Sequence, residues 1–416
     1  MMIKKLVKKL DNGLTIVCVS NDKKHYQGAS INIKYGFAIN DFYIDNIEYH
    51  YPDGLAHLLE HTLIEDSIYG NAGEYFLDNY VDYNGETYDY FTKYYIITHE
   101  DFTKHLVELI NMVNNSKFSK EKQKEIKGPI YEEIKGKKDN RYFNYNMEKI
   151  KSLYNEPEYK LGCGEVEDVK NFTYEDLQLI YNAFYKPSNE ILTVYGNFDI
   201  DEIVSIIEST YESIDRNYLD FNIIKHDEKV DVKRDYCELV DDKIIPSVSV
   251  FYKMKFDEFK NVPKDNLLWY LDLFLRINFS RRSSLYKELY NEGVTLYPIN
   301  YGITTPYNHN MLVITIDVAG EDKDKILKRV DETINEKLMP TLEDFTIFKN
   351  RSLMSFLFDE DNPGRICGGY LSNVLSFNRE EFDSLDDIKK LDYNEMKEYI
   401  NTLKFSNKTV IVTKEK

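Results

Sequence analysis

A segment near the middle of the chain is matched by a second segment at its end, and this repeat constrains the fold more than any other feature. "FTYEDLQLIYNAFYKPSNEILTVYG" begins at Phe172, and "LDYNEMKEYINTLKFSNKTVIVTKE" begins at Leu391. In each copy a capping residue, Thr173 or Asp392, precedes an amphipathic helix, then Ser-Asn and a strand rich in β-branched residues. A shared unit at the end of each domain indicates duplication.

Two related α+β domains are therefore predicted within the 416 residues, a length that allows two or three ordinary domains. The first domain is expected to span 1–214 and the second 236–416, with the polar segment 215–235 as linker. In the first domain, apolar periodicity predicts strands at Asn12–Ser20, Gly28–Phe37 and Glu86–His99, and helices at Gly54–Ile64, Asn71–Gly85, Phe102–Asn115 and Ser119–Lys138. Each domain is expected to be an antiparallel-rich sheet flanked by helices.

The stretch "DGLAHLLEHTLIEDS", Asp53 to Ser67, carries two histidines on an amphipathic helix. Positions i and i+4 lie on one helix face about 6 Å apart, so His57 and His61 can bind one metal ion together. Glu60 adjoins His61 and can lie beside the ion without ligating it, as a base toward water bound to the metal. H-x-x-E-H is the inverted zincin pattern, which predicts a zinc site with Glu60 as catalytic residue.

A catalytic zinc usually takes a third protein ligand, and the acidic helix "IKGPIYEEIKG" is the best supply. Glu132 and Glu133 are neighbours that point about 100° apart, so at most one faces inward. Glu133 shares a face with Ile130 and Ile134, which favours it as the inward carboxylate. Glu132 remains the alternative, and a single glutamate on a helix rich in lysine and glutamate usually faces solvent.

Composition excludes some classes of partner. The net charge is −19, from 72 acidic and 53 basic residues, which argues against a nucleic-acid backbone. A cationic peptide suits this charge, and so does an acidic surface kept for solubility. No run of about 20 apolar residues exists to span a bilayer, and the first residues lack an apolar signal core, so we expect a cytoplasmic protein. The four cysteines are widely spaced and fit reduced thiols.

With these motifs in view, the chain resembles the pitrilysin/insulinase family of zinc metallopeptidases, the inverzincins. "GLAHLLEH" looks like the family's Gly-x-Ala-His-Phe-Leu-Glu-His, and "NGETYDYFTKYY" is similar to Asn-Ala-x-Thr followed by Thr-x-Tyr-Tyr, with Gly85 in place of alanine. "KGPIYEEI" resembles the helix with the glutamate ligand, which places the third zinc ligand at Glu133, with Glu132 as runner-up. "FYKPSNEILTVYGNFD" and "SSLYKELYNEG" are similar to two further family segments.

The resemblance implies a fold and a reaction. The length is that of the shorter bacterial and mitochondrial-processing type, whose subunits pair into a clam-like dimer. Such enzymes are metalloendopeptidases that hydrolyse small or unfolded peptides in an enclosed chamber, and small bacterial relatives suggest peptide maturation. Substrate extends along an edge strand. Here the implied substrate-binding residues are Asn84, Gly85, Glu86 and Thr87.

Two departures from the family pattern bear on partners. Active members often carry an arginine and a tyrosine in the second domain, at positions that read Tyr290 and Leu296 here, with Tyr297 one residue off. A further glutamate of the family is replaced by Ile126, next to Glu125.

The missing arginine predicts a heterodimer, in which a related second subunit supplies the arginine and tyrosine. A homodimer is less favoured, and Arg281, Arg282 and Tyr297 are the residues that would serve it. The alternative function is a non-catalytic structural or peptide-binding subunit of the same fold.

Overall fold

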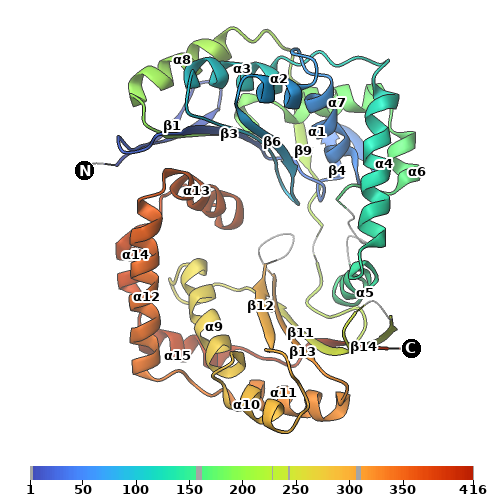
Figure 1. Ribbon diagram of the computed structural model, residues 1–416, viewed down its shortest axis with the longest axis vertical. Coiled ribbons are helices and arrows are strands. Elements are labelled where there is room, and N and C mark those ends of the chain that lie inside the picture. The colour runs from blue at the N-terminus through green and yellow to red at the C-terminus, as the bar shows by residue number, and fades with distance from the viewer. Residues whose placement is uncertain (1–2, 156–161, 227, 242–243, 306–310, 416) are drawn as a thin grey trace. The chain divides into compact units, whose positions relative to one another are not determined.

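Three β-sheets organise the chain in the computed structural model, which describes residues 3–155, 162–226, 228–241, 244–305 and 311–415 (Figure 1). A six-stranded sheet runs in the order β1-β2-β8-β3-β7-β6, a five-stranded sheet in the order β10-β14-β11-β13-β12, and a small one in the order β5-β4-β9. The strands are β1 (Lys4–Lys9), β2 (Thr15–Ser20), β3 (Gln27–Ile33), β4 (Asp41–Ile44), β5 (Ile47–His50), β6 (Asp82–Thr87), β7 (Thr92–Thr98), β8 (Glu190–Gly196), β9 (Phe221–Ile223), β10 (Tyr236–Val240), β11 (Ser247–Lys255), β12 (Asn300–Thr304), β13 (Met311–Ala319) and β14 (Lys408–Lys414).

The chain divides into two units, each built around one of the larger sheets. The first comprises Met1–Lys137, Lys160–Lys225 and Asp359–Leu375. The second comprises Lys138–Tyr159, His226–Phe358 and Ser376–Lys416. These units differ from the predicted domains in two segments. Lys138–Tyr159 belongs to the second unit and Asp359–Leu375 to the first, because packing and not chain order assigns each segment to a sheet.

The two larger sheets share one strand pattern. In the first, β2 pairs with β8 in parallel, and β3, β7 and β6 follow in antiparallel register. In the second, β10 pairs with β14 in parallel, and β11, β13 and β12 follow in the same way. The helices before β8 and β14 begin at the predicted caps, since the side chains of Thr173 and Asp392 each accept a backbone N–H. This shared pattern supports a duplication.

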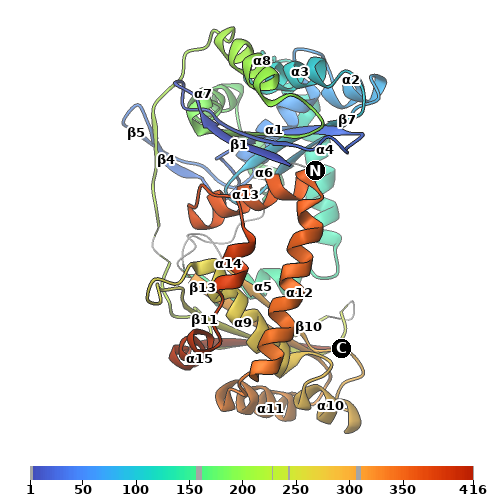
Figure 2. The ribbon, with the colours of Figure 1, turned by 90° about the vertical axis from the view of Figure 1, so that its left-hand side faces the viewer.

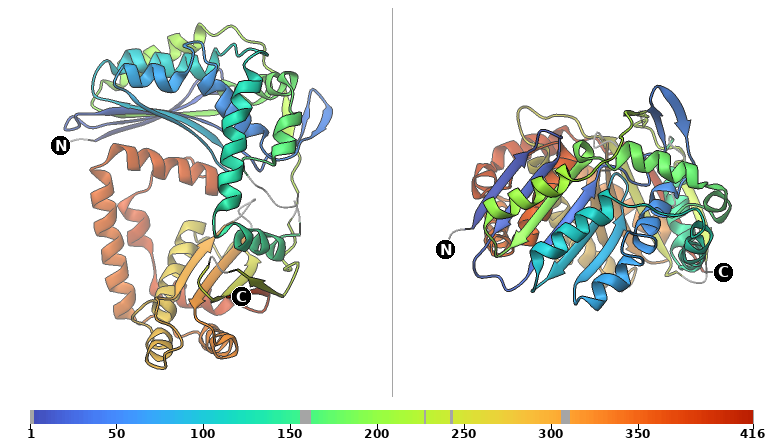
Figure 3. Two further views of the ribbon diagram at one scale, coloured as in Figure 1. Left: turned by 45° about the vertical axis from the view of Figure 1, so that its right-hand side comes forward. Right: turned by 90° about the horizontal axis from the view of Figure 1, so that it is seen from above.

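Helices cover both faces of the six-stranded sheet (Figure 3). One helix, α13, approaches the face opposite α3 and α8, where the Cys367 Sγ lies 3.9 Å from the Val194 carbonyl oxygen (Figure 1). The helices of this unit are α1 (Leu55–Glu65), α2 (Ala72–Asp78), α3 (Phe102–Asn114), α4 (Gln123–Asp139), α6 (Val166–Asn171), α7 (Tyr174–Phe184), the 3₁₀ helix η1 (Pro187–Asn189), α8 (Ile200–Glu212) and α13 (Pro363–Phe377).

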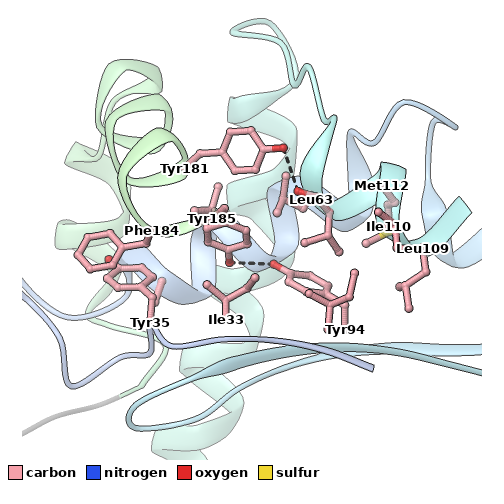
Figure 4. Close-up of a cluster of buried hydrophobic side chains, with 14 of the residues drawn as sticks. Ile33, Tyr35, Leu63, Tyr94, Leu109, Ile110, Met112, Tyr181, Phe184 and Tyr185 are labelled. Carbon is pink, nitrogen blue, oxygen red and sulfur yellow. Dashed lines mark hydrogen bonds between the residues drawn. The ribbon is translucent and has the colours of Figure 1, made fainter. Parts of the chain in front are cut away.

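The core between sheet and helices fixes α1. Leu55, Leu59 and Leu63 of this helix are fully buried. Figure 4 shows Leu63 within an aromatic cluster, where the Tyr94 and Tyr185 hydroxyls lie 3.0 Å apart. Burying side chains of this size stabilises the fold by about 1.5–3 kcal/mol each. The leucine stripe therefore orients the rest of α1, including its histidines.

The second unit holds α5, although α5 lies in the first half of the chain. The Lys253 ammonium is fully buried, donates to the Leu153 carbonyl at 2.7 Å, and pairs with Glu228. These contacts tie the end of α5 to β11. The helices of this unit are α5 (Phe143–Leu153), α9 (Lys264–Phe279), α10 (Ser284–Asn291), α11 (Lys323–Glu336), α12 (Leu342–Glu360), α14 (Leu385–Lys390) and α15 (Tyr393–Thr402). Among the described helices, none combines the length and apolar character needed to cross a membrane.

Some predicted elements were wrong in their bounds. The helix expected at Asn71–Gly85 ends at Asp78, because Tyr80 takes a left-handed backbone with φ of 60° and the chain then enters β6. The strand expected at Glu86–His99 is two strands, the end of β6 and all of β7. The alternation of polar and apolar residues in this segment does not indicate the turn between the two strands.

The sequence also missed the small sheet. The hairpin of β4 and β5 turns at Asp45 and Asn46, which both have positive φ, and it projects from the first unit (Figure 2). Its third strand, β9, lies within the predicted linker.

Candidate metal centre

The helix that carries the histidines begins at a close backbone contact. Gly54 precedes α1 with φ of 106°, and a Cβ there would lie 2.8 Å from the Cys163 carbonyl oxygen. Only glycine adopts this conformation without strain and leaves room for the neighbouring segment. The contact sets where α1 starts and how it is oriented.

Two histidines of α1 and one glutamate of α4 converge. The Nε2 atoms of His57 and His61 lie 3.3 Å and 3.7 Å from Oε2 of Glu133. One candidate ligand atom from each residue lies within 4.8 Å of the others, and no second such set of three is found among the described residues. The structure thus brings together the three predicted metal ligands, although Glu133 lies 72 residues beyond His61 in the chain.

This donor set fits zinc. Ligand atoms 2.0–2.1 Å from a tetrahedral ion are about 3.3 Å apart, which is close to the observed nitrogen–oxygen distances. Two imidazole nitrogens and one carboxylate oxygen are also a usual catalytic zinc set, with the fourth position left open.

Glu65 supports the second histidine, and the sequence analysis did not single it out. Its Oε1 lies 3.2 Å from Nδ1 of His61, one helical turn away. A carboxylate at this nitrogen fixes the tautomer that leaves Nε2 free to ligate, as metal-bound histidines usually require. The i+4 spacing of His61 and Glu65 was the available signal.

The electrostatics of the cluster differ from one member to the next. Burial, together with His61, lowers the pKa of His57 to about 4, which keeps this imidazole neutral as a ligand must be. The hydrogen bond with His61, helped by Lys137, lowers the pKa of Glu133 to about 2. Burial works to lower the pKa of His61, but its contacts with Glu133, Glu60 and Glu65 outweigh burial and raise that pKa.

Glu60 lies on the inner side of the same helix, 5% exposed. The Thr87 hydroxyl of β6 donates to its Oε2 at 2.7 Å, and a Cβ on Gly85 would lie 3.0 Å from its Oε1. Burial raises the pKa of Glu60, and the bond from Thr87 opposes that rise. A buried carboxylate with a raised pKa beside a candidate metal cluster can exchange a proton with water.

The four predicted substrate-binding residues lie on β6, at the edge of the six-stranded sheet as expected. Gly85 and Thr87 face α1, whereas Asn84 and Glu86 alternate to the other face. Glu86 accepts a hydrogen bond from the Tyr88 hydroxyl at 2.8 Å. Of these four residues, Thr87 is the one whose side chain donates a hydrogen bond to Glu60, the proposed base.

The remaining candidates lie apart from the cluster. Glu132 is exposed and pairs with Lys135, so Glu133 is the glutamate that faces the histidines. Ile126 is buried in the core while Glu125 is exposed.

In the second unit, the positions at which the family resemblance leads us to expect an arginine and a tyrosine are open to solvent. Tyr290 and Tyr297 are each 50% exposed, and Leu296 is 74% exposed.

Comparison with known proteins adds a family context. Residues 171–350 match the family model described as the Peptidase M16 inactive domain. The Bacillus subtilis protein named "Uncharacterized zinc protease YmfH" is 26% identical over 378 residues, which cover 87% of this chain and 85% of that protein. A solved structure described as M16-like, from Alicyclobacillus acidocaldarius, superposes with a TM-score of 0.87 at 20% identity over 100% of this chain and 99% of that one. This chain has the fold of an M16-like peptidase.

The M16-like fold extends to longer proteins. Pitrilysin superposes with a TM-score of 0.66 at 15% identity over 99% of this chain, but the chain spans only 45% of pitrilysin. The family model begins after the histidines and Glu133, so the segment described as inactive does not include the candidate metal centre.

Proposed function

We propose that this protein is a zinc-dependent endopeptidase acting on small or unfolded peptides. The observation that carries the proposal is the convergence of His57, His61 and Glu133 within 4.8 Å of one another, beside the buried Glu60. The name of the homologous B. subtilis protein, a zinc protease, supports the same metal and reaction.

The chemistry divides among these residues. His57, His61 and Glu133 would hold the ion, which when bound supplies a Lewis acid that polarises a peptide carbonyl and lowers the pKa of water. Glu60 takes a proton from the attacking water and later returns it to the leaving amine. Thr87 holds Glu60 toward β6 through its hydrogen bond.

The substrate is proposed to lie along β6 as an added strand. Among the described strands β6 ends the sheet, so the backbone groups on its outer side are available to a peptide. Such binding recognises the peptide backbone more than its side chains, which suits small or unfolded peptides. One role that fits this specificity is the maturation of a peptide. A related second subunit is proposed to complete the chamber and supply the arginine and tyrosine.

A non-catalytic, peptide-binding subunit is the second candidate. It is favoured by the match of residues 171–350 to the inactive M16 domain and by Tyr290 and Leu296 at the positions of the arginine and tyrosine. Measurement of zinc and hydrolysis separates the two candidates.

The test uses the full chain, alone and mixed with a related candidate subunit, against a peptide library. Glu60→Gln is expected to retain zinc and to lose about 10²- to 10⁴-fold in kcat, because only the proton-transfer group is removed. Glu133→Gln is expected to lose zinc, measured by mass spectrometry of the metal.

Glu132→Gln is the matched control, since Glu132 is the adjacent but exposed carboxylate, and it should behave like the wild type. If the wild type binds no zinc and cleaves nothing with any partner, the non-catalytic function is correct. Equal hydrolysis by wild type and Glu60→Gln would exclude the role given to Glu60.

A further inference from the structure

Lys137 lies one turn after Glu133 on α4, and the carboxylate oxygen nearest to its ammonium is not the one nearest to the histidines. Its Nζ is 2.8 Å from Oε1 of Glu133. The other oxygen, Oε2, is the one that lies 3.3 Å and 3.7 Å from the imidazoles of His57 and His61. The two oxygens of Glu133 thus have different nearest partners.

The buried Cys163 thiol is a second side-chain partner of the same ammonium, and its interaction works to raise the pKa of Lys137. Cys163 and Gly164 pack backbone to backbone on the residues that precede α1, since a Cβ on Gly164 would lie 2.3 Å from the Asp53 carbonyl oxygen. Lys137 therefore connects the helix that carries Glu133 to the segment that sets the start of the histidine helix.

We propose that Lys137 is a positioning residue for the metal centre, which holds Glu133 with Oε2 turned toward the histidines. The inference rests on the proposed zinc site. Glu133 is 36% exposed, so its carboxylate has room to turn toward solvent when the hold on Oε1 is removed. Loss of a partner that orients a metal ligand typically weakens metal binding 10- to 100-fold.

The charge of Lys137 acts in the opposite direction, because an ammonium near a divalent ion repels it. This charge is balanced by Glu133 through a direct ion pair. The geometric hold is therefore expected to exceed the repulsion, and the sign of the measured change decides between the two effects.

The experiment measures zinc affinity of the full chain by competition with a chelating dye, and the visible spectrum of the cobalt-substituted protein. Lys137→Met is expected to weaken zinc binding about tenfold and to alter the cobalt spectrum, because Glu133 no longer has one orientation. Lys137→Arg should restore both, since a guanidinium can still donate to Oε1. Lys135→Met is the matched control on the same helix, because Lys135 pairs with the outward-facing Glu132.

Unchanged or tighter zinc binding by Lys137→Met, with the wild-type cobalt spectrum, would overturn this inference and leave the zinc site standing. Failure of the wild type itself to bind zinc would overturn the proposed function, and this inference with it.

Discussion

At the scale of single residues, the pKa of Glu60 depends on the side chains and burial around it more than on its place in the H-x-x-E-H motif. Burial raises its pKa, and the Thr87 hydroxyl, which donates to Oε2 at 2.7 Å, works against that rise by stabilising the carboxylate. A base must be deprotonated to accept a proton. If Glu60 is the base, as proposed, the hydrogen bond from Thr87 is expected to set how far into the acid range Glu60 can accept a proton.

Thr87→Val should move the acid limb of the pH profile of kcat/KM to higher pH. Removal of the hydroxyl raises the pKa of Glu60 further, so a larger fraction of the carboxylate is protonated at a given acid pH, and activity there falls severalfold. Activity on the alkaline side of the limb should change less. Thr87→Ser keeps the hydroxyl and is the control. A limb that stays in place in Thr87→Val would show that the bond does not tune Glu60.

At the scale of elements, the site depends on how α1 begins. Gly54 has φ of 106° and lies against Cys163, whereas Gly70 has φ of 82° with no atom within 4 Å of an added Cβ. The two glycines share a positive φ and differ in crowding. Replacing each glycine by alanine therefore separates two contributions to the free energy of unfolding. One is the cost of a side chain at positive φ, and the other is the cost of displacing a packed segment.

Gly54→Ala is expected to destabilise the protein more than Gly70→Ala, as measured by the thermal unfolding midpoint and by urea unfolding. Gly70→Ala should cost about 1–2 kcal/mol, the usual penalty of a side chain in this conformation. Gly54→Ala has the same conformational cost, and its methyl group must also displace the backbone of Cys163. It should weaken zinc binding too, because the histidines move with α1. Equal costs for the two variants would show that the contact with Cys163 is not tight.

At the scale of the whole molecule, the candidate metal ligands all lie in the first unit. The second unit repeats the strand pattern without a comparable set of metal-binding residues in its described part. Pitrilysin is about twice as long as this chain, which spans 45% of it. We propose that a second, related subunit completes the chamber.

The isolated chain is therefore expected to bind zinc and to hydrolyse peptides poorly, and a related partner should raise hydrolysis by at least about tenfold by supplying an arginine that stabilises developing charge. Gel filtration should show the two chains eluting together. A partner lacking that arginine is the control. Full activity from the isolated chain, together with loss of that activity in Arg281→Ala or Arg282→Ala, would instead favour the homodimer.

Local sequence patterns were sufficient to predict the features that depend on neighbours within one or two helical turns. The pairing of His57 with His61 follows from i, i+4 spacing, and the caps at Thr173 and Asp392 follow from local hydrogen bonding. The same periodicity favoured Glu133 over Glu132, because Glu133 continues a buried stripe.

Contacts between residues far apart in the chain became visible only in the folded protein. The contact of Thr87 with Glu60, the hold of Lys137 on Glu133, and the packing of Cys163 on Gly54 join segments that no local pattern relates. The end of α2 at Asp78 and the placement of α13 on the first sheet were also decided there. The physical reason is that hydrogen bonds and close packing depend on distance in space, which spacing along the chain fixes only within a single helix or strand.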